Sequence, residues 1–405
     1  MKVAVLVNYF FPYMSGLTEY VYQLCAAMHQ MGLKVEVHCW RNSPDMSDFE
    51  NIDGIEVHRY GGLLNLDKGI ISPRYMSKLM FGLGKYDLII PVMPMAEAAL
   101  PYLFNSNKKI LPAYVCDIQL GKSFVSRVIE FFSYSSMRFA ANHSKAIIAL
   151  SDDYAQSSLV VAKHLRRIIP IAPPIRVEQR RHEVFIDFLE RYQLDPGRKR
   201  IGFLGRIVTE KGLDILIDAA NRNAEYFQNY DFLLAGNSQT VAGGSVKSIL
   251  ERMISKKISV RFLDFIPHSL MNQFYSSLDL FVMPSTMRLE AYGIVQVEAM
   301  LCGTPVVTTQ LAGVREPVMI TRFGELCEPR NPTSLFNAMH HVLENKINYQ
   351  LDRHDIIAKL GLDRSYSNVQ KVVGDFLAQS GNAFLNASTE DISLDKMKLS
   401  RNEGR

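Results

Sequence analysis

The chain has 405 residues, of which 48% are hydrophobic and 21% are charged, with 45 Lys and Arg against 41 Asp and Glu. This length suits two domains of about 150 to 200 residues each, and the composition excludes a largely disordered chain. The net charge of +4 lies in the first 180 residues, which hold 19 basic and 15 acidic side chains, while the rest holds 26 of each. So small a bias argues against a dedicated nucleic-acid-binding protein.

The N-terminus, MKVAVLVNYFFPYMSG, has one Lys, a short apolar run and no small-residue cleavage site. It therefore favours a first buried strand over a signal peptide, and we expect a cytoplasmic protein. The most apolar stretch, YDLIIPVMPMAEAALPYLF, contains three prolines, Asp87 and Glu97, so we expect no membrane span. Five cysteines without CxxC spacing indicate reduced thiols and no disulfide or zinc framework.

The first half of the chain alternates strand and helix patterns. An apolar strand at 2–7, an amphipathic helix at 18–32 and a strand at 34–40 form a βαβ unit. Further strand candidates separated by helical stretches lie at 87–93, 109–115, 145–150 and 166–172. Continuous apolar strands of this kind predict a parallel sheet that is covered by helices on both faces.

The pattern starts again in the second half. Strand candidates lie at 200–207, 230–238, 258–264, 279–285 and 304–309, and helices are expected at 212–223 and 267–278. We predict an α/β fold of two doubly wound parallel-sheet domains, with the ligand site at the carboxyl ends of the strands. The predicted parts are a first domain at 1–178, a link at 179–198, a second domain at 199–360, a C-terminal helix at 361–380 that packs back towards the first domain, and a mobile tail at 381–405.

The segment RLEAYGIVQVEAM places Glu290 and Glu298 eight residues apart. In a continuous helix they would be about 12 Å apart, beyond the roughly 5 to 9.5 Å of carboxylates that share one glycosidic bond. A helix that begins near Gly293 would instead point the N–H groups of Tyr292, Gly293 and Ile294 at an anion, with one glutamate at each end of an extended ligand. On spacing alone, two ordinary surface charges are an equal alternative.

A second cluster, GRIVTEKG, places Arg206 at the end of a strand and Lys211 beside Gly212 at a helix start. Two cations at this edge suit a diphosphate, whose charge they would offset as a leaving group departs. Taken alone this signal is weak, because single basic residues on turns are usually solvated.

Together these segments resemble the retaining glycosyltransferases of family 4, whose GT-B fold has two facing Rossmann-like domains. The resemblance covers the chain to about residue 375 and is carried by EAYGIVQVE followed by AMLCGTPVV, by SLDLFVMPS, by FLGRIVTEKGLDILIDA, by LLAGNS and by VRFLDFIPHSLMNQFYSS. It implies that Arg206 and Lys211 bind the donor diphosphate. It also implies that Glu290 binds the donor sugar hydroxyls and Glu298 the ribose.

The resemblance further implies a UDP- or GDP-sugar donor, no metal or other cofactor, and a glycan or lipid-linked acceptor in cell-surface polysaccharide synthesis. The predicted catalytic residues are Arg206, Lys211, Glu290 and Asp117. The predicted donor-binding residues are Ser15, Gly16, Gly205, Gly236, Phe265, Pro284, Ser285, Tyr292, Gly293, Ile294 and Glu298. The adjacent aspartates of SDDY indicate helix capping rather than a metal site.

The first half departs from the family pattern at two places. Ser15 stands where the family has a second glycine beside Gly16, and we expect this serine to restrict the loop. Val115 and Cys116 stand where the family often has a histidine, and Asp117 is retained. Two alternatives therefore stay open, a catalytically weakened GT-B protein that binds a nucleotide sugar and a sugar-nucleotide epimerase or hydrolase.

The resemblance places the acceptor on the first domain, often as a lipid-linked sugar at the cytoplasmic membrane face. Two basic amphipathic segments, 59–85 and 121–139, fit peripheral contact with anionic lipid. The alternative is that their apolar side chains face the first core.

Overall fold

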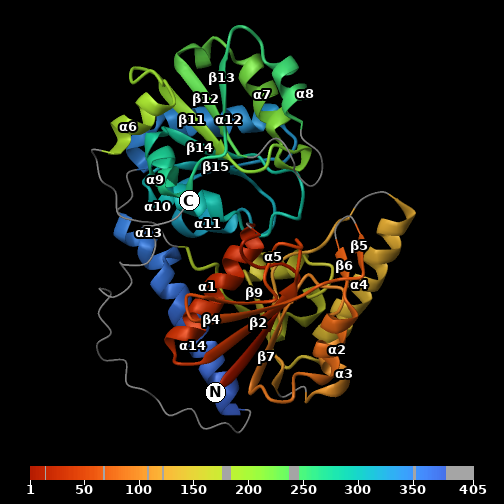
Figure 1. Cartoon of the computed structure of the whole chain (residues 1–405). Coiled ribbons are helices and arrows are strands. Elements are labelled where there is room, and N and C mark those ends of the chain that lie inside the picture. The colour runs from red at the N-terminus through yellow and green to blue at the C-terminus, as the bar shows by residue number, and fades with distance from the viewer. Residues whose placement is uncertain are drawn as a thin grey trace.

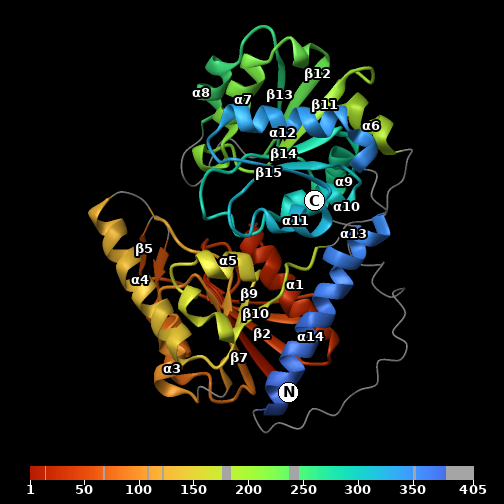
Figure 2. The same cartoon turned by 180° about the vertical axis from the view of Figure 1, so that it is seen from behind.

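The computed structural model describes residues 1–13, 15–66, 69–106, 109–120, 123–175, 184–236, 246–349 and 353–379. Two α/β domains lie one above the other, with the first below the second in Figure 1. The last helix runs back along the side of the first domain, as Figure 2 shows from behind. The architecture confirms the predicted α/β fold with two parallel-sheet domains.

The first domain is built on an eight-stranded sheet in the order β10-β9-β8-β7-β1-β2-β4-β3. Its strands are β1 (Lys2–Leu6), β2 (Lys34–Trp40), β3 (Phe49–Ile52), β4 (Ile55–Tyr60), β7 (Leu88–Met93), β8 (Ala113–Tyr114), β9 (Ile147–Ala149) and β10 (Ile168–Pro170), and a separate ribbon pairs β5 (Leu64–Leu66) with β6 (Gly69–Ile71). Its helices are α1 (Gly16–Gln30), α2 (Pro73–Phe81), α3 (Leu100–Phe104), α4 (Phe124–His143), α5 (Asp152–Ser157) and the 3₁₀ helix η2 (Ala162–Arg167).

The second domain is built on a six-stranded parallel sheet in the order β13-β12-β11-β14-β15-β16. Its strands are β11 (Lys199–Leu204), β12 (Tyr230–Ala235), β13 (Ser259–Asp264), β14 (Leu280–Met283), β15 (Val306–Thr309) and β16 (Gly324–Cys327). The helices are α6 (Val184–Arg191), η3 (Thr209–Lys211), α7 (Leu213–Arg222), η4 (Tyr226–Asn229), α8 (Lys247–Met253), α9 (His268–Ser277), α10 (Ile294–Leu301), α11 (Glu316–Thr321), α12 (Pro332–Glu344), η5 (Lys346–Tyr349), α13 (Arg353–Leu360) and α14 (Leu362–Gln379).

The central strands form where the sequence has continuous apolar runs. Every residue of β7 and β12 is buried, because helices cover both faces of each sheet. The sequence prediction does not include strands β3, β4, β5, β6 and β16. In β4 buried and half-buried residues alternate, and β3 pairs with it in antiparallel fashion at the sheet edge, so neither has a continuous apolar run.

Contacts on two sides hold the domains together. Asp153 at the start of α5 accepts hydrogen bonds from the Arg315 guanidinium at 2.6 and 3.0 Å and from the Gly313 N–H at 2.7 Å. On the other side, α14 packs against α1, and the Tyr366 hydroxyl donates to Gln23 at 2.6 Å. The SDDY segment thus begins a helix, capped by the Ser151 hydroxyl, and also links the two domains.

Two sequence predictions fall partly or wholly outside the described residues, namely the link at 179–198 and the tail at 381–405. Across the part of the chain that the structure describes, the helices are too short or too polar to cross a membrane.

Gly236, which follows β12, allows a close approach to Gly205, which follows β11. The φ of Gly236 is +139°, and a Cβ on Gly236 would lie 1.8 Å from the Gly205 carbonyl oxygen. We expect Gly236→Ala to lower the free energy of unfolding by about 1–3 kcal/mol in urea denaturation. Gly374→Ala on α14, where no atom lies within 4 Å of the added Cβ, is the matched control and should raise it by about 0.5–1 kcal/mol. Equal losses in both variants would contradict this account.

Candidate functional site

Lys211 and Glu290, 79 residues apart, form an ion pair at the carboxyl edge of the second sheet. Lys211 ends η3, and Glu290 lies in the loop between β14 and α10. Gly212, next to Lys211, allows this ion pair to form. Its φ is +69°, and a Cβ there would lie 2.0 Å from the Pro284 carbonyl oxygen. Only glycine lets the start of α7 come this close to the end of β14.

Arg206 lies beside the same pair. Its guanidinium contacts the Glu210 carboxylate at 2.5 Å. A cavity of about 50 Å³ is lined by Arg206, Glu210, Lys211, Met287, Leu289 and Glu290. Three of the predicted catalytic residues therefore share one cavity. Glu210 was not predicted from the sequence. Its position four residues after Arg206, a spacing typical of helical ion pairs, is the signal that could have found it.

Helix α10 begins as the sequence predicted. Gly293 adopts a left-handed conformation with φ +75°, and Ile294 is the first helical residue, without a side-chain cap. Among the described residues, the backbone N–H groups of Tyr292, Gly293 and Ile294 donate to no other backbone carbonyl. A Cβ on Gly16 would lie 4.0 Å from the Ile294 side chain, so the β1–α1 loop of the first domain faces this helix start. The positive end of α10 therefore lies between the two domains.

Glu298 lies one turn after Ile294 on the same face of α10. The Tyr275 hydroxyl donates to its carboxylate at 2.6 Å. Burial raises the pKa of Glu298, and nearby Glu19 of α1 adds to the shift, while Tyr275 and His268 oppose it. Glu298 thus faces the first domain and lies outside the cavity beside Lys211.

The first domain contributes the loop after β8. Burial raises the pKa of the Cys116 thiol to about 12, and the charges of Asp117 and Glu290 add to this effect, so Cys116 lies near Glu290 across the cleft. Asp117 is buried; it accepts hydrogen bonds from the Tyr114 hydroxyl and the Leu159 N–H, and its carboxylate lies 3.6 Å from the Arg288 guanidinium. The structure therefore ties Asp117 to the loop that carries Glu290 and does not place it among the residues that line the cavity.

Comparison with known proteins identifies the second domain. Residues 185–359 match the family described as glycosyl transferases group 1. The uncharacterized glycosyltransferase MJ1607 of Methanocaldococcus jannaschii is 25% identical over 335 residues, which cover 74% of this chain and 78% of the relative. Residues 185–359 thus form a domain of the group 1 glycosyltransferase type.

Solved structures show the same fold over nearly the whole chain. Sucrose-phosphate synthase from Thermosynechococcus elongatus superposes with a TM-score of 0.74 at 19% identity, covering 93% of this chain and 99% of that one. The Anabaena protein Alr3699/HepE in complex with UDP-glucose superposes with a TM-score of 0.69 at 19% identity, covering 93% and 100%. The two domains thus form a GT-B fold.

The remaining predicted site residues lie around this edge with different exposure. Ser285 is buried, and its hydroxyl has no partner among the described residues. Tyr292 is buried as well, with its hydroxyl unpaired in the same part of the chain, whereas the side chain of Phe265 after β13 is largely exposed. Their predicted role in donor binding stays a prediction.

Ser15 corrects one expectation about the first loop. Its φ of −158° is extended backbone that any residue adopts, so serine does not restrict the loop as we expected. Its hydroxyl accepts from the Thr18 N–H at 3.2 Å and caps α1. The serine therefore stabilises the helix that faces Glu298.

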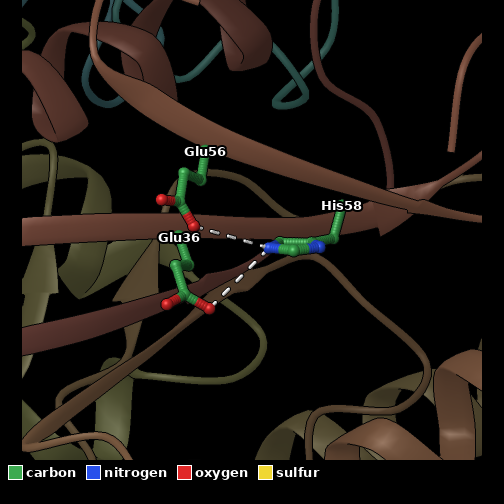
Figure 3. A group of neighbouring side chains, drawn as sticks. All are labelled: Glu36, Glu56 and His58. Carbon is green, nitrogen blue, oxygen red and sulfur yellow. Dashed lines mark ion pairs between the residues drawn. The ribbon is translucent and has the colours of Figure 1, made fainter. Parts of the chain in front are cut away.

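Within the described ranges, one group of side chains of the types that can bind a metal lies together, on strands β2 and β4 of the first sheet. Glu36, Glu56 and His58 bring their ligand atoms within 4.8 Å of one another, and Figure 3 shows the His58 ring directed at both carboxylates. Lys85 pairs with Glu36 at 3.0 Å and Lys34 with Glu56 at 2.7 Å. The lysines supply the positive charge, so we interpret the group as an ion-pair network.

The cysteines should be chemically inert in the native state. Burial raises the pKa of Cys39, Cys116 and Cys327 to about 12, so these thiols stay protonated at pH 8. We expect no alkylation of Cys116 by iodoacetamide at pH 8 in the native protein and full alkylation in denaturant, as measured by mass spectrometry. Selective labelling of Cys116 in the native protein would contradict its assigned environment.

Proposed function

We propose that the protein is a retaining, metal-independent glycosyltransferase of family 4 that moves a sugar from a UDP- or GDP-sugar to a glycan or lipid-linked saccharide acceptor. The observation that carries the proposal is the cavity in which Arg206 and Lys211 lie beside Glu290. The free N–H groups at the start of α10 lie in the same loop as Glu290. The proposed setting is cell-surface polysaccharide synthesis at the cytoplasmic face of the membrane.

In this proposal the second domain stabilises the leaving diphosphate. Lys211 and Arg206 offset the negative charge that grows on the diphosphate, and the positive end of α10 adds to this stabilisation. Glu290 accepts hydrogen bonds from the donor sugar hydroxyls, and Glu298, oriented by Tyr275, does the same for the ribose. In this proposal the acceptor attacks from the same face as the leaving diphosphate, and a donor phosphate oxygen accepts the acceptor's proton. A strong side-chain base is then not needed at the position of Cys116, where the family often has a histidine. The UDP-glucose in the Anabaena structure supports a nucleotide-sugar donor.

Lys211→Ala and Glu290→Ala should each lower the rate of sugar transfer at least about tenfold, because each removes a charged hydrogen-bonding group from the transition state. Transfer is measured with a radiolabelled nucleotide sugar after circular dichroism has shown native folding. The matched control is Arg222→Ala, which removes an exposed ion pair with Asp218 on α7 and should leave the rate unchanged.

Near-normal rates in both site variants would refute the assignment. The products separate the alternatives. Release of free sugar indicates a hydrolase, and a new nucleotide sugar indicates an epimerase. Donor binding without turnover indicates a catalytically weakened protein.

We further propose that the first domain contacts anionic membrane through α4, which lies on its outer flank, opposite α14 (Figures 1 and 2). Phe124 and Phe131 of α4 are 82% and 67% exposed, and Arg127 and Arg138 lie on the same helix. These two phenylalanines are exposed, so the alternative that they pack in the core of the first domain does not apply to them. An apolar surface with basic residues suits an anionic lipid surface.

The other segment, 59–85, supports membrane contact less well. Tyr75 and Leu79 are buried in the core, while Leu63 and Phe81 are exposed. Arg59 is buried and pairs with an acidic side chain, and Lys68 lies outside the described residues.

Phe131→Ser together with Phe132→Ser should reduce flotation with vesicles of phosphatidylcholine and phosphatidylglycerol, because both side chains are exposed apolar surface. The matched control is Phe49→Ser, which removes an exposed phenylalanine from the edge strand β3 and should float like wild type. Flotation that does not depend on anionic lipid, or that survives the double substitution, would count against the proposed contact.

A further inference from the structure

Buried polar atoms without partners gather at the carboxyl edge of the first sheet. Among the described residues, Asn8 Oδ1, Trp40 Nε1 and Glu97 Oε2 are buried and make no hydrogen bond. Asn8 follows β1, Trp40 ends β2 and Glu97 follows β7, and these strands are neighbours in the order β7-β1-β2. Because neighbouring parallel strands end at the same edge, the three side chains lie along one side of the domain.

Aromatic rings join these side chains into one cluster. The Tyr9 ring lies 5.4 Å from the Trp40 ring and 5.0 Å from the Tyr13 ring. Burial raises the pKa of the Tyr9 hydroxyl to about 12, and the charges of Tyr13 and Glu97 add to the shift. The backbone N–H of Trp40 donates to the backbone carbonyl of Asn8 at 3.1 Å, so the two residues are neighbours.

Glu97 is the most unusual member of the cluster. Its side chain is only 8% exposed, and burial raises its pKa to about 7. The neighbouring Tyr75 hydroxyl does not satisfy it, because that hydroxyl donates to the carbonyls of Val7 and His38. The carboxyl accepts a hydrogen bond from its own backbone N–H, but its oxygen Oε2 has no partner among the described residues. A buried oxygen without a partner is costly to the fold, and such groups in native proteins call for an explanation, such as a bound ligand or ion.

The cluster lies next to the place where the donor sugar would sit. Strand β8 neighbours β7, with Met93 paired to Tyr114. Cys116 lies two residues after Tyr114, and the charge of Glu290 adds to the raised pKa of its thiol. Since strands are about 4.8 Å apart, β7, β1 and β2 lie roughly 5 to 15 Å along this edge from β8. The cluster therefore lies along the same edge of the first sheet as the loop after β8.

We propose that Asn8, Trp40 and Glu97 form the acceptor subsite and that the acceptor places an uncharged, hydroxyl-bearing sugar ring there. This proposal rests on the proposed function. Trp40 Nε1 can only donate, whereas the Asn8 and Glu97 oxygens accept, and sugar hydroxyls do both. The faces of Tyr9 and Tyr13 suit the apolar C–H face of a sugar ring.

The charges nearby argue against an anionic acceptor ring. Two described cations follow or flank this edge, and both are already paired. Arg41 lies 3.0 Å from Asp48, and Arg59 lies 2.7 Å from Glu50. A phosphate or carboxylate beside Glu97 would meet like charge without a free cation.

The test measures sugar binding separately from donor binding. Saturation-transfer NMR with UDP present uses the methyl glycosides of glucose, mannose, galactose and N-acetylglucosamine as probes. We expect at least one to bind the wild-type protein at millimolar concentration. Glu97→Leu and Trp40→Phe should each weaken that binding about tenfold, while Glu97→Gln, which can still donate and accept, should retain most of it.

UDP affinity should stay unchanged in all of these variants. Glu316→Gln on α11 is the matched control, because Glu316 also has a buried unpartnered oxygen among the described residues and a pKa raised by burial, but lies in the other domain. It should bind the glycoside like wild type.

Several results would overturn the subsite. One is that Glu97→Leu and Trp40→Phe bind the methyl glycoside with wild-type affinity. Another is that glucose 6-phosphate binds more tightly than any methyl glycoside. The third is that the wild-type protein binds no glycoside. If Glu97→Leu does not fold, Trp40→Phe and Glu97→Gln carry the comparison. Failure of the wild-type protein to bind UDP or GDP is a different outcome, because it contradicts the proposed donor site and not the subsite.

Discussion

The close approach of Gly212 to the Pro284 carbonyl is the constraint on which the second domain's site depends. A Cβ at this position would lie 2.0 Å from that oxygen, so any other residue would push η3 away from the loop after β14. With glycine there, Lys211 reaches Glu290, and Arg206 lines the same cavity. A single missing side chain thus brings together charges from distant parts of the chain.

The loop between β14 and α10 connects this site to the first domain. Glu290 pairs with Lys211 in its own domain, and Arg288, two residues earlier, donates to the Ser157 carbonyl of the first domain. The Tyr154 hydroxyl donates to the Arg288 carbonyl at 3.2 Å and accepts from the Asp117 N–H at 2.8 Å. Asp117 is therefore best understood as part of the junction between the domains, and movement of one domain against the other would move Glu290.

The two edges of the cleft differ in chemistry. The second domain offers cations and a helix start, which suit a phosphate-bearing ligand, while the first offers a carboxyl, an indole N–H and aromatic rings, which suit an uncharged polar one. In the proposed function this difference would let the donor and the acceptor bind separate sets of groups. The first domain's α4 adds an exposed apolar flank away from this cleft.

The sequence by itself determined the alternation of strands and helices and a helix start near Gly293, since periodicity and turn glycines are local properties. The grouping of Arg206, Lys211 and Glu290 came from the resemblance to family 4 glycosyltransferases, because spacing alone left ordinary surface charges as an equal alternative. The sequence missed Glu97, because a glutamate after an apolar strand has no local pattern that distinguishes buried from exposed. It also could not place Asp117, whose partners Leu159 and Arg288 lie far along the chain. Only the tertiary structure decided these, because burial, pKa and the pairing of distant charges depend on which segments the fold packs together.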